Sequence, residues 1–221
     1  MALVTLLELR TRVRERADMV YSQFVSDAEL NRYINESAQE LYDLLVQANV
    51  DYYSTLESFT IAPGANTHTL PDDFYKIRTL DIDLGGRFCP VWPYNVQERG
   101  YWQDAVISRI AAPVLYRVVG GTLELVPSLS AAGSYRLTYV PLLEPMVDDT
   151  DEFNGFNGFE TYIIVDAAIK AKDKEESSVT VLTKQKDELM KRIEAMANVV
   201  DYGANSSIAN VRDGLGYNDI Y

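Results

Sequence analysis

Hydrophobic residues recur at three- and four-residue spacing in the first fifty residues of the chain, which predicts helices. The first stripe consists of Leu6, Leu9, Val13, Ala17 and Val20. A second stripe follows Ser26 and Glu29, whose spacing is that of a capping box at a helix start. Its members are Leu30, Ile34, Ala38, Leu41, Leu45 and Ala48. We expect a short helix and then one of about six turns.

After Asn49 the hydrophobic period changes from helical to alternating, which predicts strands. The clearest hairpin is "VLYRVVGGTLELV", where a two-residue Gly120-Gly121 turn pairs Arg117 with Glu124. A further strand, "SYRLTYV", alternates apolar and polar residues until Pro141. These segments predict an antiparallel β region.

Helical spacing returns in "FETYIIVDAAIKAKDKEE" and "SSVTVLTKQKDELMKRIEAMANVV". The apolar stripe of the second segment consists of Leu182, Leu189, Ile193, Met196 and Val200. It is too short for an isolated coiled coil and favours a seam within a helix bundle. The order of segments predicts an α+β fold in which a four-helix bundle carries an inserted antiparallel β domain. We assign 1–50 and 154–200 to the bundle, 51–147 to the β domain and 201–221 to a flexible, extended C-terminal arm.

The arm contains three glycines and three asparagines with almost no periodicity, so we expect it to hold no structure alone. It is either a frayed end or a segment that orders along a partner. Its scattered apolar residues, the candidate anchors, are Ile208, Val211, Leu215, Tyr217, Ile220 and Tyr221.

Four arginines flank the first apolar stripe, with Arg10 and Arg14 on one side and Arg12 and Arg16 on the other. They form either a solvated helix edge or a contact with an acidic neighbouring subunit, because guanidinium groups pair well with carboxylates.

The stretch "DDTDEFNGFNGFE" has partial calcium-loop spacing, with Asp149, Asp151 and Glu160 at positions one, three and twelve. Phe153 stands at position five, where a side-chain oxygen is needed. A capping box formed by Asn157 and Glu160 explains the segment better and predicts a helix start.

Charge and composition exclude several classes of function. The 221 residues carry a net charge of −13, which disfavours a phosphate-binding surface but is compatible with DNA passing nearby without binding. A single cysteine, Cys89, excludes an internal disulfide and fits a reducing cytosol. We expect no membrane span and no signal peptide, since the basic residues near the N-terminus follow the apolar ones.

No motif for catalysis stands out, and we predict no catalytic residue, metal or cofactor. His68 is the only histidine, and no glycine-rich loop carries the lysine of a phosphate site. An aromatic cluster in "FCPVWPYNVQERGYWQDA", with Trp92 and Trp102, is either a stacking platform for a ligand or a packed loop or subunit contact.

The order of these parts resembles the adaptor (head-to-tail connector) proteins of tailed bacteriophages. The resemblance rests on "SDAELNRYINESAQELYDLL", "LPDDFYKIRTLDI", "LYRVVGGTLELVPS", "YRLTYVP" and "FNGFETYIIVDAAIKAKDKEES", and the plan is similar to the T7-like tail tubular type. It implies a structural virion protein of the phage neck, made in the host cytoplasm, and no enzyme. It also implies a homo-oligomeric ring, commonly of twelve copies, that contacts the portal protein and a tail or nozzle protein around a DNA channel. A tail terminator, a head-completion protein and a tail-associated glycan-binding module remain alternatives.

Overall fold

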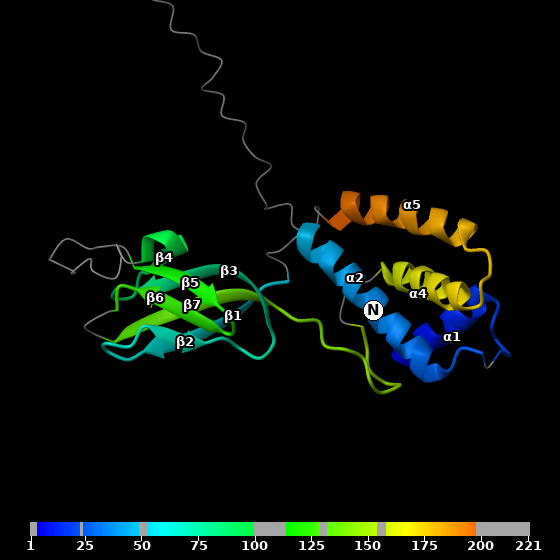
Figure 1. Ribbon diagram of the computed structural model, residues 1–221, viewed down its shortest axis with the longest axis horizontal. Helices are drawn as coiled ribbons and strands as arrows, with labels where there is room; N and C mark the ends of the chain where they lie inside the picture. The colour runs from blue at the N-terminus through cyan, green and yellow to red at the C-terminus, as the bar shows by residue number, and fades with distance from the viewer. Residues whose placement is uncertain are drawn as a thin grey trace, which may run out of the picture.

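This computed structural model describes residues 4–22, 24–48, 53–99, 114–128, 132–153 and 158–197. Helices gather on one side of the molecule and strands on the other (Figure 1). The helices of the described residues are α1 (Leu6–Ala17), α2 (Asp27–Ala48), α4 (Glu160–Lys174) and α5 (Thr180–Ala197). The α+β class predicted from the sequence is therefore confirmed.

Helix α1 ends earlier than its apolar stripe predicts. The stripe residues from Leu6 to Ala17 are buried, but Asp18 adopts a left-handed conformation with φ of 60° and ends the helix. Val20 is therefore exposed, and Met19 takes the buried place instead. The prediction that Val20 continues the stripe is wrong, because the chain turns at Asp18 before Val20 reaches the core.

Helix α2 begins at the predicted capping box. The Glu29 amide donates to Ser26 Oγ over 3.3 Å, and the Ser26 amide donates to the Glu29 carboxylate over 3.0 Å. Both groups satisfy amides that the first helical turn leaves without partners. The predicted stripe is buried from Leu30 to Leu45, with Ala48 at its edge.

Helix α4 is the central helix of the described residues, since it contacts α1, α2 and α5. Its buried alanines, Ala167, Ala168 and Ala171, have small side chains that let neighbouring helices approach closely. Helix α5 packs on α2 and α4 through Leu182 and Ile193, whereas Met196 of its predicted stripe is half exposed.

The strands of the described ranges form a seven-stranded sheet in the order β1-β7-β3-β4-β5-β6-β2. Their bounds are β1 Thr55–Ile61, β2 Thr67–Thr69, β3 Phe74–Asp83, β4 Phe88–Pro93, β5 Leu115–Val119, β6 Thr122–Val126 and β7 Gly133–Pro141, with a 3-10 turn at Val96–Glu98. The predicted β5–β6 register is confirmed, with Arg117 opposite Glu124. The prediction of a purely antiparallel sheet is wrong, because β4 and β5 run parallel. A connection of about twenty residues separates them, which is long enough for the crossover that parallel strands need.

The sheet curls until its two edge strands meet, so that it is nearly a closed barrel. His68 on β2 stacks on Phe59 of β1, with ring centroids 3.7 Å apart and planes 4° apart. His68 Nε2 also lies 3.5 Å from a carboxylate oxygen of Glu57 on β1. Side chains thus close the seam between the edge strands, and His68 has a structural place in the barrel.

The helices and the sheet contact one another where β7 ends. The Tyr42 hydroxyl on α2 donates to the Pro141 carbonyl over 2.9 Å. Tyr42 and Val46 also pack against the fully buried Val140. This contact connects α2 directly to the sheet.

Candidate functional site

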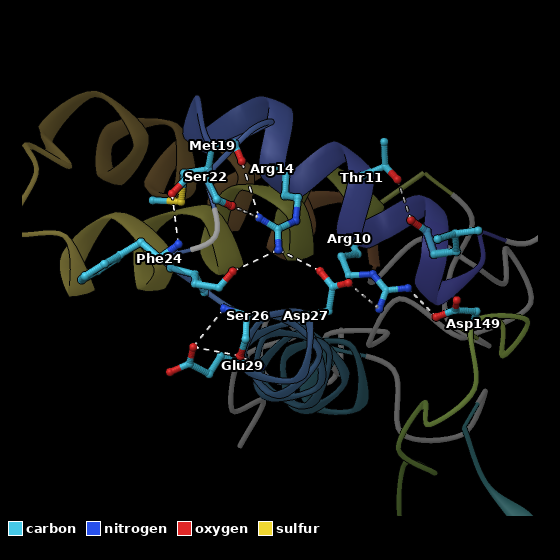
Figure 2. A network of polar contacts seen from close by, with 12 residues as sticks. Arg10, Thr11, Arg14, Met19, Ser22, Phe24, Ser26, Asp27, Glu29 and Asp149 are labelled. Carbon is cyan, nitrogen blue, oxygen red and sulfur yellow. Dashed lines mark hydrogen bonds and ion pairs between the residues drawn. The ribbon is translucent and has the colours of Figure 1, made fainter.

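Two of the four predicted arginines, Arg10 and Arg14, face the interior of the chain (Figure 2). Their side chains are only 11% and 18% exposed. Arg14 donates to the carbonyls of Ser22 and Val25 over 2.9 and 3.0 Å and to the Asp27 carboxylate over 2.7 Å. One buried guanidinium therefore fixes the turn between α1 and α2.

Arg10 connects α1 to a different part of the chain. Its guanidinium pairs with the Asp149 carboxylate and lies 3.8 Å from that of Asp27 (Figure 2). The hydrogen bond from Arg14 holds the pKa of Asp27 below its ordinary value, and the charges of Arg10 and Arg14 act in the same direction. Asp27 is therefore the shared anion of the two inward arginines.

The other two arginines, Arg12 and Arg16, point toward solvent. Arg12 is 46% exposed and pairs with Glu8 one turn earlier on α1, and Arg16 donates to Gln185 on α5. All four arginines thus have partners within one chain. A contact of these arginines with a neighbouring subunit stays a prediction, and Arg12 and Arg16 are the two that lie at the surface.

A buried ion cluster that the sequence analysis missed joins α2, α4 and α5. Its centre is Asp166, which is 2% exposed. This carboxylate accepts hydrogen bonds from Ser37 over 2.7 Å, from Lys170 over 2.9 Å and from Lys186 over 2.6 Å. Lys170 and Lys186 also donate to Glu40 over 2.9 and 3.1 Å. The cluster balances two cations against two anions.

The pKa values in this cluster follow from burial and pairing. Burial opposes ionisation of Asp166, but hydrogen bonds from Lys186, Ser37 and Lys170 outweigh it and keep its pKa below the ordinary value. The pKa of Lys186 is raised for the reciprocal reason, because hydrogen bonds to Asp166 and Glu40 outweigh its desolvation. Burial raises the pKa of the adjacent Tyr162 to about 12. All members except Tyr162 and Ser37 are therefore charged at neutral pH.

The segment with partial calcium-loop spacing instead caps helix α1. The carbonyls of Asp151 and Asp149 accept the amides of Leu6 and Leu7 over 2.8 and 3.2 Å. The Asp151 carboxylate accepts the amides of Val147 and Asp148, which lowers its pKa. These acids organise a turn and satisfy the first amides of α1.

The capping box predicted for the next helix is wrong. The N-cap of helix α4 is Phe159, without a side-chain cap hydrogen bond, so Glu160 is the first helical residue and not the third, as a box with Asn157 requires. The Glu160 carboxylate accepts the Gly158 amide over 3.0 Å. Asn157 lies outside the described residues.

Across the described ranges, no group of three or more His, Cys, Asp or Glu side chains could bind a metal ion. No helix in these ranges is both long and apolar enough to cross a membrane.

A groove of about 700 Å³ lies where the helices meet the sheet. Its apolar walls come from α2, from the end of β7 and from the segment that follows β7. They include Ala38, Tyr42, Pro141, Leu142, Leu143, Met146 and Phe153. The titratable acids that line it are Asp73, Glu144, Asp151 and Glu152, and no lysine, arginine or histidine of the described residues is among its lining side chains. The groove is therefore more polar than apolar and carries negative charge, and Leu142 is an exposed apolar side chain within it.

The remaining predicted residues are placed only partly. Trp92 is 65% exposed at the end of β4, whereas Trp102 lies outside the described residues. The entire arm, with its six apolar anchors, also lies outside them. The ligand platform and the portal-binding arm stay predictions.

The pattern of parts matches one known protein family over nearly the whole chain. The SU10 adaptor protein family matches residues 4–211, which include every described element. The chain belongs to this family. This adaptor is thus a structural bacteriophage protein and a virion component. Membership in a family of structural adaptors implies a non-enzymatic role. Its likeness to the T7-like tail tubular type of adaptor stays a prediction. No curated protein matches the adaptor.

Proposed function

We propose that this adaptor docks as a ring beneath the portal of the capsid and joins the capsid to the tail. The observation that carries this proposal is the SU10 adaptor family match over residues 4–211. The ring contains about twelve copies, in keeping with closed cyclic symmetry, and receives a tail or nozzle protein on its other side. DNA passes through its centre without sequence-specific binding.

The structure supports this role through two regions joined by a limited contact. The four helices of the described residues share one core, and the Asp166 cluster and the arginine network connect them. The sheet has its own core around Leu80, Leu123 and Leu137. We propose that the helical bundle (1–50 and 154–200) and the inserted β domain (51–147) act as separate docking bodies for different neighbours.

The charge of the chain supports passage of DNA. A net charge of −13 per copy repels phosphates within roughly a Debye length of about 8 Å at physiological salt. Subunits with the same net charge also repel one another, so ring formation needs enough buried area and local charge pairing to offset this repulsion. The free adaptor is therefore monomeric, and the portal acts as the template for the ring.

The C-terminal arm supplies the contact with the portal in this proposal. Ordering about twenty residues costs roughly 1–2 kcal/mol each in backbone entropy, which contacts with the portal must offset. The apolar residues Ile208, Leu215 and Tyr221 are candidate anchors for these contacts.

Truncation tests the proposed docking. A chain that ends at Val200 is expected to unfold at the same denaturant concentration as the full chain but to lose co-sedimentation with the purified portal. A matched full-length variant with Ile208, Leu215 and Tyr221 changed to serine controls for the length of the arm and is expected to lose docking too. Undiminished docking of the truncated chain would refute the role of the arm.

A further inference from the structure

The β3–β4 hairpin has an exposed tip that is both apolar and cationic. Leu84 is 60% exposed, Arg87 is exposed, and no ion pair within the described residues involves Arg87. Gly85 and Gly86 have φ of 73° and 91°, as a two-residue hairpin turn requires. The Leu84 amide donates to the Arg87 carbonyl over 2.9 Å, and the Gly86 amide donates to the Asp83 carboxylate over 2.6 Å. The tip thus has a defined shape before any partner binds.

A second cation lies directly behind the tip. The Arg136 guanidinium on β7 stacks over the Phe88 ring, 3.7 Å from its centroid. Phe88 is itself partly exposed and enlarges the apolar surface that Leu84 begins. The tip therefore offers an apolar surface with two arginines beside it. Asp83 lies at the same turn, where its carboxylate accepts the Gly86 amide, and Asp81 lies opposite Arg136.

The groove between the helices and the sheet has the complementary character. Its apolar wall includes Leu142, which is 47% exposed. Two of its acids, Glu144 and Glu152, have side chains without a hydrogen bond or ion pair to another described residue. Carboxylates without a cation, beside apolar walls, suit a partner that brings both a cation and an apolar side chain.

Strand β3 places the tip and the groove at opposite ends of the sheet. It begins at Phe74, next to Asp73 in the groove, and ends at Asp83, next to the tip. A ten-residue strand spans about 30 Å. Two complementary surfaces that far apart cannot contact one another within one copy, but they can pair between copies. Such head-to-tail pairing closes into a ring when the rotation between copies allows it.

We propose that the β3–β4 tip of one copy docks in the groove of the next copy. Leu84 contacts the apolar wall beside Leu142, and Arg87 pairs with Glu144 and Glu152. A second copy fits better than an unrelated partner because the same chain carries both halves of the contact. This inference rests on the proposed ring and identifies one of its subunit contacts.

Disulfide trapping between free, full-length chains tests the contact, because an irreversible cross-link accumulates encounters between monomers that are too brief to form a stable ring. Cys89 is first replaced by serine, and two single-cysteine variants, L84C and L142C, are mixed under mild oxidation, one of them with a mass tag. We expect the L84C–L142C heterodimer to form about tenfold faster than the heterodimer of L84C with V181C, since a specific encounter raises the local thiol concentration. Val181 is a suitable control because it is exposed on α5, away from the groove. Equal rates for the two pairs would overturn the proposal.

A charge exchange adds a test that does not depend on the cysteine positions. Cross-linking should slow when the L84C chain carries R87E. It should also slow when the L142C chain instead carries E144K together with E152K. Combined across the two chains, they should restore the rate, because the ion pairs form again with opposite polarity. A combined rate no higher than the single-chain rates would also overturn the proposal.

The tip-to-groove contact and the docking of a ring beneath the portal can be tested separately. Cross-linking uses free chains and needs no portal. A ring on the portal without specific cross-links would refute only the tip-to-groove contact. Specific cross-links without assembly on the portal would refute only the proposed docking beneath the portal.

Discussion

Replacement of Lys186 by methionine should loosen helix α5 from the rest of the helical region. Lys186 donates to Asp166 over 2.6 Å and to Glu40 over 3.1 Å, and it is the α5 residue of the buried ion cluster. Methionine keeps much of the side-chain length and removes the charge. The two carboxylates would then share one cation, Lys170.

The expected loss follows from the burial of each partner. Removal of one member of a fully buried pair costs about 3–5 kcal/mol, because the remaining charge stays buried. Asp166 is almost fully buried but keeps Ser37 and Lys170, and the Lys186 side chain is 24% exposed. We therefore expect K186M to lower the free energy of unfolding by about 2 kcal/mol.

Urea unfolding followed by circular dichroism measures this loss. The matched control is K184M, which removes an exposed lysine of α5 and should change stability by less than about 0.5 kcal/mol. A double-mutant cycle of K186M with D166N should give a coupling energy of at least about 1 kcal/mol. If K186M is no less stable than K184M, or if the cycle shows no coupling, the ion cluster does not hold α5 in place.

Three further predictions address the arginine network, acid stability and the contact between helices and sheet. R14M should lower the free energy of unfolding by about 2 kcal/mol, because three carbonyls and Asp27 lose the cation that donates to them. The control R12A should lower it by less than about 0.5 kcal/mol. Equal urea midpoints for the two variants would contradict a structural role of Arg14. Hydrogen bonds from Lys174 and Ser26 lower the pKa of Glu29 from 4.5 to about 2. Between these pH values the unfolded chain binds more protons than the folded chain, so the free energy of unfolding should fall as the pH drops through this range. E29Q should reduce the dependence of the free energy of unfolding on pH, and an unchanged dependence would refute the role of Glu29. Y42F should cost about 1 kcal/mol through the lost hydrogen bond to Pro141, and a thermal midpoint equal to that of the unmodified chain would show that this bond is dispensable.

The local elements were predictable where the pattern is set by neighbours along the chain. The Ser26–Glu29 capping box and the β5–β6 register depend on residues a few positions apart, and the structure confirms both. The end of α1 was not predictable from its stripe, since Val20 keeps the helical spacing. The left-handed cap at Asp18 overrides that spacing, and Met19 is buried instead.

Long-range polar pairing was the part that periodicity could not reveal. Asp166 stands within the apolar run "YIIVDAAI", and Lys186 stands midway between Leu182 and Leu189 of the α5 stripe. A charged residue within each of two apolar stripes was the available signal for a buried pair. The partners are twenty residues apart, so only the packing of α4 against α5 brings them together. The parallel β4–β5 pair was missed for a similar reason, because strand direction depends on the path of a long connection.

Assembly on the portal is decided by the mass of the adaptor in solution, measured by light scattering for the adaptor by itself and for its mixture with the portal. We predict a monomer of 24.9 kDa for the adaptor by itself and a stoichiometric ring of about twelve copies on the portal. A monomer whose mass does not change when the portal is added would contradict this prediction.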